Sequence, residues 1–232
     1  MTAYNLLNKL LFLSIAILAG CECVPSIVSP EIKEPTEFAN VKFINSVPDC
    51  DSVNVWESDR EVLTNLNFDS ATADYKKISS GLPNIRLANA KDSSIFYNAI
   101  LDFVKDNKYT LVAYGSRRRY NVLLLNDKIS DYNQSNAYIR FINTSPDSPA
   151  LKFVISSYPI NPVLTFKSFT NYSAIPIGSY NLSIVDIATN SELLNLKNLE
   201  FKQGSTYTLV LKGFVQTGKS KKLQCVVVEG KN

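Results

Sequence analysis

Carboxylate side chains, acting alone as in some glycosidases, and a Ser-Lys pair are the catalytic groups that remain open to this chain, because the sequence contains no histidine. That absence excludes Ser-His-Asp and Cys-His catalysis and histidine-ligated metal sites. A retaining glycosidase, which uses carboxyl groups alone and keeps the configuration of the sugar's anomeric carbon, holds its two catalytic carboxyl groups about 5–5.5 Å apart. Asp49 and Asp51 form one such pair in sequence, and Asp69 and Asp74 form another. These four residues are therefore the candidates for acid-only chemistry.

The chain carries one sequence pattern twice. Residues 39–49 read ANVKFINSVPD, and residues 137–147 read AYIRFINTSPD, 98 positions later. Residues 108–115 (KYTLVAYG) recur at the same offset as residues 206–213 (TYTLVLKG). A period this long exceeds that of solenoids and propellers, so each copy is expected to be a domain with its own core.

The repeat argues against the acidic pairs as catalysts. Asp49 recurs as Asp147, but Asp51 becomes Pro149, so a catalytic pair would be only half copied. The chain also lacks a G-x-S-x-G elbow, a phosphate-binding glycine loop and an Asp-rich calcium loop. We therefore expect no enzyme activity, no catalytic residue, no cofactor and no metal site, with the acidic residues solvated in loops.

Short strands are the elements that position these residues. In residues 41–43 and 139–141, apolar side chains alternate with a cation, Lys42 or Arg140, which we expect to face water. Similar alternation gives seven or eight strands in each copy and no clear helical period. The pattern predicts an all-β protein of two tandem immunoglobulin-like antiparallel β-sandwich domains. The first domain is expected at residues 39–127 and the second at residues 137–232. Residues 128–136 are expected to form a polar surface linker, with few contacts between the copies.

The residues repeated in the motif are expected to serve the fold. Asn and Pro-Asp are typical of turns, because proline fixes φ and Asn or Asp side chains bond nearby backbone N–H groups. A tyrosine just after a tight turn resembles the tyrosine corner of immunoglobulin-like sandwiches, whose hydroxyl bonds upstream backbone. A glycine ends the same strand in each copy. The repeated residues are Phe43, Asn45, Pro48, Asp49, Tyr109 and Gly115, with Phe141, Asn143, Pro146, Asp147, Tyr207 and Gly213 as their counterparts.

The first residues predict export and a lipid anchor. Residues 10–18 form an uncharged apolar run that is too short to span a membrane and fits a signal peptide. The following Leu-Ala-Gly-Cys21 resembles the lipobox of bacterial lipoproteins, which implies cleavage after residue 20 and lipid attachment at Cys21. Residues 21–38, with three spaced prolines, are predicted to form an extended tether. We expect a bacterial cell-envelope protein held on a membrane by lipid, at a periplasmic or surface face.

Charge and cysteine content limit the partners. The chain has 24 Lys and Arg against 21 Asp and Glu, a balance that argues against nucleic acid. Its one basic cluster, residues 117–119 (Arg-Arg-Arg), is either a solvated hairpin tip or a contact for anionic lipid or another polyanion. With Cys21 lipidated, Cys23, Cys50 and Cys225 remain, an odd number without the spacing of a zinc site.

The pattern A-x-[VI]-[KR]-F-I-N-[ST]-x-P-D, a later Pro-x-Gly-x-Tyr and a closing Tyr-Thr-Leu-Val-x-x-Gly resemble the DUF4397 family of bacterial secreted and surface domains. Both copies carry the resemblance, and the second copy is the better match, because the first lacks the tyrosine of the middle motif. The resemblance implies a β-sandwich in an envelope protein and supplies no catalytic residue.

Three functions are compatible with the sequence. The first is a non-catalytic envelope lipoprotein whose sandwiches contact a partner protein or a surface assembly. The second is a glycan-binding module, since Trp56 and Tyr114 fall on the side of their strands that we expect to face water and could stack on sugars. The third, an acid-only hydrolase, is the least supported. The ligand or partner is therefore expected to be a protein or a glycan, not a nucleic acid.

Overall fold

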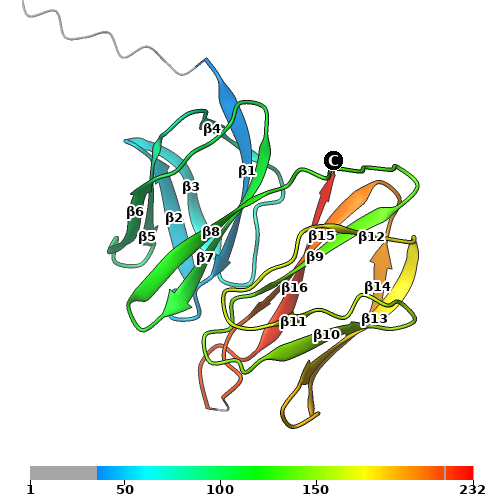
Figure 1. Cartoon of the computed structure of the whole chain (residues 1–232). Helices are drawn as coiled ribbons and strands as arrows, with labels where there is room; N and C mark the ends of the chain where they lie inside the picture. The colour runs from blue at the N-terminus through cyan, green and yellow to red at the C-terminus, as the bar shows by residue number, and fades with distance from the viewer. Residues whose placement is uncertain (1–35, 217, 232) are drawn as a thin grey trace, which may run out of the picture. The chain divides into compact units, whose positions relative to one another are not determined.

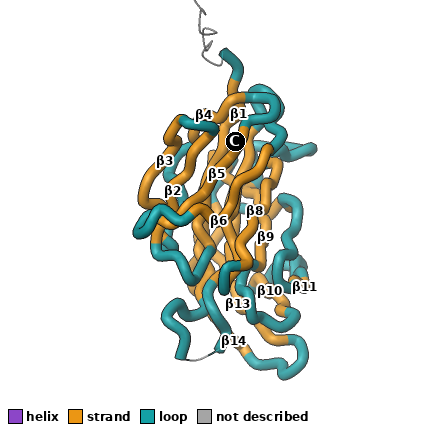
Figure 2. The backbone as a smooth tube through the Cα atoms, turned by 90° about the vertical axis from the view of Figure 1, so that its left-hand side faces the viewer, coloured by secondary structure: helices purple, strands orange, loops and turns teal. Residues whose placement is uncertain are grey.

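The computed structural model describes residues 36–216 and 218–231, and all regular secondary structure in this part of the chain is β-strand (Figures 1 and 2). The predicted signal peptide (1–20), Cys21 and Cys23 lie outside the described residues, together with the tether (21–38) up to residue 35. Each copy contributes eight strands. The first copy has β1 (Phe38–Ser46), β2 (Ser52–Glu57), β3 (Arg60–Asn67), β4 (Lys76–Ser79), β5 (Asn84–Asn89), β6 (Ile95–Ile100), β7 (Lys108–Ser116) and β8 (Arg119–Asn126). The second has β9 (Ala137–Asn143), β10 (Leu151–Ile155), β11 (Val163–Leu164), β12 (Ser173–Ile175), β13 (Gly178–Asp186), β14 (Glu192–Phe201), β15 (Ser205–Lys212) and β16 (Gln224–Lys231).

Each copy folds into two four-stranded sheets with the same strand order. The first copy has sheets β4-β1-β7-β8 and β3-β2-β5-β6, and the second has β12-β9-β15-β16 and β11-β10-β13-β14. This arrangement confirms two tandem immunoglobulin-like β-sandwiches. One detail differs from a fully antiparallel fold, because β1 pairs with β7, and β9 with β15, in parallel. Parallel neighbours need a long crossover connection, and here the five intervening strands of each copy provide it.

The alternating residues fill a separate core in each copy. In β1, Val41 and Phe43 are buried in the first core, and Ile139 and Phe141 hold the same places in the second. Phe141 packs on Phe153 across the sandwich, with ring centroids 5.3 Å apart. These contacts confirm the side of each strand that the sequence assigned to the interior.

The opposite side of the same strands is also buried, because the two copies pack against each other there. A third apolar cluster joins Ile44, Val112 and Leu125 of the first copy to Ile142, Val210 and Val228 of the second. The expectation of few contacts between the copies is therefore wrong. Strands buried on both faces read as continuous apolar runs, and Phe43-Ile44 and Phe141-Ile142 follow this pattern. The described part of the chain thus contains two cores and one interface between the copies, which we call the inter-copy interface.

Candidate functional site

The repeated asparagine organises the turn that follows the first strand of each copy. Asn45 Oδ1 accepts the backbone N–H of Val47, and its Nδ2 donates to the carbonyl oxygens of Cys50 and Leu66. Asn143 makes the matching bonds to the N–H of Ser145 and to the carbonyl of Leu164. A buried amide that bonds three backbone groups fixes the turn and joins it to the neighbouring strand.

The repeated aspartate and the repeated glycine of each copy stabilise the same loop. Asp49 accepts the backbone N–H of Arg117, and Asp147 accepts those of Val215 and Gln216 at 2.8 and 3.1 Å. In each case the carboxylate reaches the loop that follows the repeated glycine. A Cβ built on Gly115 would lie 2.1 Å from the carbonyl oxygen of Arg119, so the backbones approach too closely for any other residue.

The repeated tyrosines form the corner that the sequence predicts. The hydroxyl of Tyr109 accepts the backbone N–H of Val104, five residues upstream, at 3.1 Å. The hydroxyl of Tyr207 accepts that of Lys202 at the same separation, at 2.9 Å. Together with Pro48 and Pro146 in the turns, these contacts give the motif residues structural roles.

The two aromatic residues considered for glycan stacking lie in different environments. Trp56 is partly exposed on the outer face of β2, where the guanidinium of Arg86 lies 5.2 Å from the centre of its ring. Arg86 is paired across the sheet with Trp56 on one side and with Asn98 on the other. Tyr114 is only 6% exposed and packs edge-on against Phe166 of the second copy, at 5.8 Å. The expectation that Tyr114 faces water is therefore wrong.

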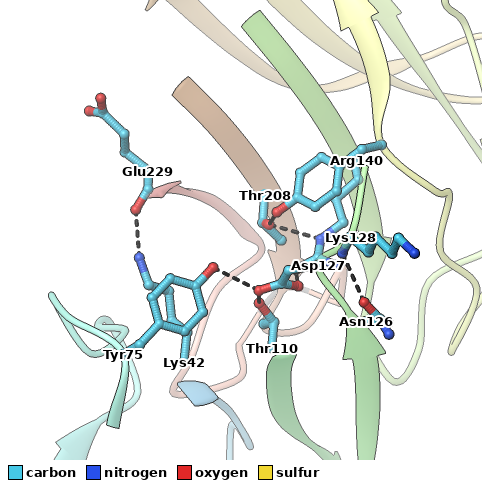
Figure 3. Close-up of polar contacts among 10 residues, drawn as sticks. Lys42, Tyr75, Thr110, Asn126, Asp127, Lys128, Arg140, Thr208 and Glu229 are labelled. Carbon is cyan, nitrogen blue, oxygen red and sulfur yellow. Dashed lines mark hydrogen bonds and ion pairs between the residues drawn. The ribbon is translucent and has the colours of Figure 1, made fainter. Parts of the chain in front are cut away.

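A buried ion pair joins the two copies across the inter-copy interface (Figure 3). Arg140 Nη2 of the second copy lies 2.7 Å from Asp127 Oδ1 of the first, and each side chain is at most 3% exposed. Asp127 also accepts the hydroxyls of Thr110 and Tyr75 at 2.9 and 2.8 Å, while Arg140 Nε donates to Thr208. Burial, followed by the charge of Asp127, raises the pKa of Tyr75, so this phenol stays protonated.

The interface has approximate twofold symmetry between the copies. Lys42, the counterpart of Arg140, donates to the backbone carbonyl of Glu229 near the end of the last strand of the second copy, at 2.7 Å (Figure 3). Each cation also stands over a tyrosine of its own copy, Lys42 over Tyr75 and Arg140 over Tyr172. The expectation that the two cations face water is wrong. The same face of each copy contacts its counterpart, as in an isologous dimer.

One further cation is enclosed by the interface. Lys212 is fully buried, and its ammonium donates to the backbone carbonyls of Asn45 and Phe68 in the first copy. Burial lowers the pKa of Lys212 to about 8, with the charge of Asp69 opposing the shift. The sequence comparison missed Lys212, Asp127 and the paired threonines as interface residues. One sequence pattern could have predicted this buried interface. Both copies carry a cation, Lys42 or Arg140, within a strand that is otherwise mostly apolar.

The acidic residues considered for catalysis take part in other contacts. Asp51 pairs with Lys221 at 2.8 Å, which lowers the pKa of its carboxyl group, and Asp69 accepts the side-chain amide of Gln224. The two thiols in the described ranges, Cys50 and Cys225, are free, and burial raises their pKa values to about 11 and about 12. Such thiols stay protonated and unreactive at neutral pH. Within residues 36–231, apart from 217, no three or more Cys, Asp or Glu side chains gather as metal ligands.

One edge of the first copy exposes several apolar side chains. Ile95 and Ile100, at the ends of β6, are 57% and 63% exposed, and Leu82 and Val104 nearby are exposed as well. β6 pairs with β5 alone among the described strands. We call these four residues the β6 edge. A search of the described residues for helices able to cross a membrane finds none.

Comparison with known proteins identifies the repeat. The family described as "Domain of unknown function (DUF4397)" matches residues 39–154 and 137–232, which confirms the resemblance in both copies. No curated protein matches the chain.

Two solved structures show a distant likeness. One is a family 26 carbohydrate-binding module, CBMbc of Amy13K from Eubacterium rectale, in complex with maltoheptaose (TM-score 0.25, 11% identity, 84% of this chain and 98% of that chain). The other is a candidate cell adhesion protein from Bacteroides eggerthii (TM-score 0.28, 9% identity, 85% of this chain and 97% of that chain). At these TM-scores neither likeness supports an argument about function.

Proposed function

Because the chain belongs to the DUF4397 family, whose description assigns no activity, we propose that it is a non-catalytic cell-envelope lipoprotein. In this proposal the two sandwiches, joined through the inter-copy interface, act as one body that presents contacts to a partner protein or a surface assembly. The joined faces are not available to a partner, since both copies use them to bind each other. A partner must therefore use the remaining faces and edges.

The observation that carries the proposal is the β6 edge. Exposed apolar side chains that gather on a protein surface mark contact sites more often than single ones do. A strand with one unpaired side also offers a row of free N–H and C=O groups, to which a partner strand can add. Ile95 and Ile100 lie at the ends of this strand, and Leu82 and Val104 extend the apolar surface past it. We assign the partner contact to this edge.

A lipid at Cys21 would hold the protein on a membrane surface. The motivating observation is the sequence Leu-Ala-Gly-Cys21 after a short apolar run. One acyl chain binds a membrane only marginally, whereas two or more give a stable anchor. In this proposal the predicted tether, residues 21–38, is the spacer between the lipid and the first sandwich.

Site-specific photocrosslinking in whole cells tests the contact. A photoreactive residue at Asn98, which is exposed within β6, should give one discrete crosslinked species, while the same residue at Thr64 in β3, the opposite edge of this sheet, should give none. The substitutions Ile95→Lys and Ile100→Lys should remove the Asn98 product without changing membrane attachment. Equal products from both positions, or a product that survives both lysine substitutions, would refute the assignment.

A second candidate function, glycan binding, is favoured by the row Trp56, Arg86 and Asn98. An aromatic ring beside an arginine and an amide on one open sheet face supplies both a stacking surface and hydrogen-bond donors. A glycan array separates the two functions. Retention of a sugar that is lost in Trp56→Ala would favour glycan binding at this row, and an array without Trp56-dependent retention, together with an intact Asn98 crosslink, would favour the protein contact.

A further inference from the structure

The approximate symmetry of the inter-copy interface allows its two ends to be compared residue by residue. At one end, Lys212 of the second copy packs on Phe68 of the first, with the ammonium 4.7 Å from the ring centre. At the other end the equivalent positions hold Tyr114 and Phe166, again 98 residues apart from their counterparts. We call the first the lysine end and the second the tyrosine end.

Polar pairs close the lysine end. Lys221 pairs with Asp51 at 2.8 Å, and Gln224 donates to Asp69 at 2.8 Å. At the tyrosine end the position of Asp51 is taken by Pro149, and that of Asp69 by Lys167. Both carboxylates are thus lost, and one is replaced by a cation.

The tyrosine end is hollow. A cavity of about 550 Å³ lies there, within the range of sites that bind small molecules. Residues of both copies line it: Tyr114, Ser116, Arg117, Arg119, Tyr120 and Asn121 from the first, and Pro146, Phe166 and Lys167 from the second.

Three cations converge on this hollow without acidic partners. Among the described residues, no ion pair involves Arg117, Arg119 or Lys167. The carboxylate of Asp49 accepts the backbone N–H of Arg117, not its guanidinium, and so holds the turn. Like charges brought together from two copies repel, so an anion bound among them would be stabilised.

The backbone at these cations is itself unusual. Arg117 and Arg118 form the two-residue turn between β7 and β8 with φ values of 51° and 64°, and Lys167 has a φ of 74°. Asn and Gly are the residues that such positions favour, since a Cβ makes the left-handed conformation costly. Arg117 and Lys167 therefore place a positive charge where Asn or Gly would cause less backbone strain. Strained backbone of this kind is typical of functional sites.

We propose that the hollow at the tyrosine end binds a uronic acid residue of an acidic glycan. The guanidinium groups of Arg117 and Arg119 match the planar carboxylate, which arginine binds through two parallel hydrogen bonds. Phe166, which is partly exposed, offers a ring surface for the sugar, and Tyr114 packs edge-on against it. The lining of the hollow includes neither Trp56 nor a residue of the β6 edge, so the inference goes beyond the proposed function and does not depend on it.

Calorimetric titration of the full chain with a hexamer of galacturonic acid tests the proposal. Arg117→Asn and Lys167→Asn each remove one charge and place a residue suited to positive φ, so folding is expected to be kept. Each should weaken binding at least tenfold, because one charge-assisted contact is lost. The matched control is Arg118→Asn, at the same turn but not in the lining of the hollow, which should change the affinity less than twofold.

A neutral hexasaccharide should not bind, and Trp56→Ala should leave the titration unchanged. The proposal is overturned if the wild-type chain does not bind the acidic hexamer, or if Arg118→Asn weakens binding as much as Arg117→Asn does. It is also overturned if saturable binding is found only with phosphatidylglycerol vesicles, because the hollow would then recognise a lipid headgroup. The Asn98 crosslink is measured separately, so failure here leaves the proposed function standing.

Discussion

Replacing Arg140 with methionine removes one partner of the buried ion pair that joins the two copies. The side chain of Arg140 is 2% exposed and that of Asp127 is 3% exposed, with the closest nitrogen and oxygen 2.7 Å apart. Without the guanidinium, the carboxylate of Asp127 stays buried, with only the hydroxyls of Thr110 and Tyr75 as donors. The substitution therefore leaves an uncompensated charge inside the interface.

Loss of one partner from such a pair costs about 3–5 kcal/mol of unfolding free energy, whereas an exposed pair contributes at most about 1 kcal/mol. Adding Asp127→Asn to Arg140→Met removes the stranded charge and keeps an oxygen that can accept the same hydroxyls. The double variant should therefore recover about 2 kcal/mol or more of the loss. Lys105 offers a matched control, because its pair with Glu37 is 2.9 Å long but both side chains are more than half exposed.

Urea unfolding of the wild type, both single variants and the double variant gives the coupling energy through a double-mutant cycle. Lys105→Met should shift the stability by less than about 0.5 kcal/mol. An Arg140→Met loss below about 1 kcal/mol would show that the pair is open to water. Strictly additive losses would show that Arg140 and Asp127 do not act on each other, and either result would refute the reasoning.

Four further predictions follow from individual contacts. Gly213→Ala should cost clearly more stability than Gly218→Ala by thermal unfolding, because both have φ near +85° but only at Gly213 would the new Cβ meet a backbone oxygen, at 2.1 Å. Burial lowers the pKa of Lys212 to about 8, below its value in the unfolded chain, so the folded state binds fewer protons than the unfolded state between about pH 8 and pH 10. The unfolding free energy of the wild type, relative to that of Lys212→Met, should therefore rise by about 1–3 kcal/mol over that window. A difference that does not change with pH would contradict this prediction. Trp56→Ala should lose about 1–2 kcal/mol, between the effects at a surface site and in a core, as measured by urea unfolding. Cys21→Ser should release the protein from washed membranes, and its retention in the pellet would refute the predicted anchor.

Local patterns predicted the parts of the fold that local physics determines. Alternation placed Val41 and Phe43 in a core, and a tyrosine after a turn predicted the bonds of Tyr109 and Tyr207 to upstream backbone. Both rest on side-chain direction and reach within a few residues. The direction of neighbouring strands does not follow from a period-two pattern, and the parallel pairing of β1 with β7 was accordingly not foreseen.

The inter-copy interface was misread because comparison of two copies cannot distinguish water from the other copy. Lys42 and Arg140 are both cations, a pattern that usually indicates a solvated face, yet each is buried against the opposite copy. Tyr114 was likewise expected to face water, yet it packs against Phe166 of the second copy. In a symmetric contact each of two equivalent residues packs against the opposite copy. A difference between them is therefore accommodated by the residues of that opposite copy and not by the residues of their own sandwich.

The same limit applies to the candidate sites. Trp56 was found from the sequence, since a lone tryptophan on the polar side of a strand is visible there. The hollow near Phe166 was not, because Arg119 and Lys167 are 48 residues apart in sequence and meet only when the copies dock. Arg117 was noticed as part of a basic cluster, but its unusual φ and its missing acidic partner are properties of the folded chain.

The most direct test of the joined-copy account uses Trp56 as a probe of the first copy. Trp56 is the sole tryptophan of the chain, so its fluorescence reports the first sandwich, while far-ultraviolet circular dichroism reports both. In urea, Gly213→Ala, a change confined to the second copy, should lower the Trp56 midpoint and the dichroism midpoint by the same amount, because the two copies unfold together. A Trp56 transition that stays at its wild-type midpoint while the dichroism splits into two steps would contradict the account.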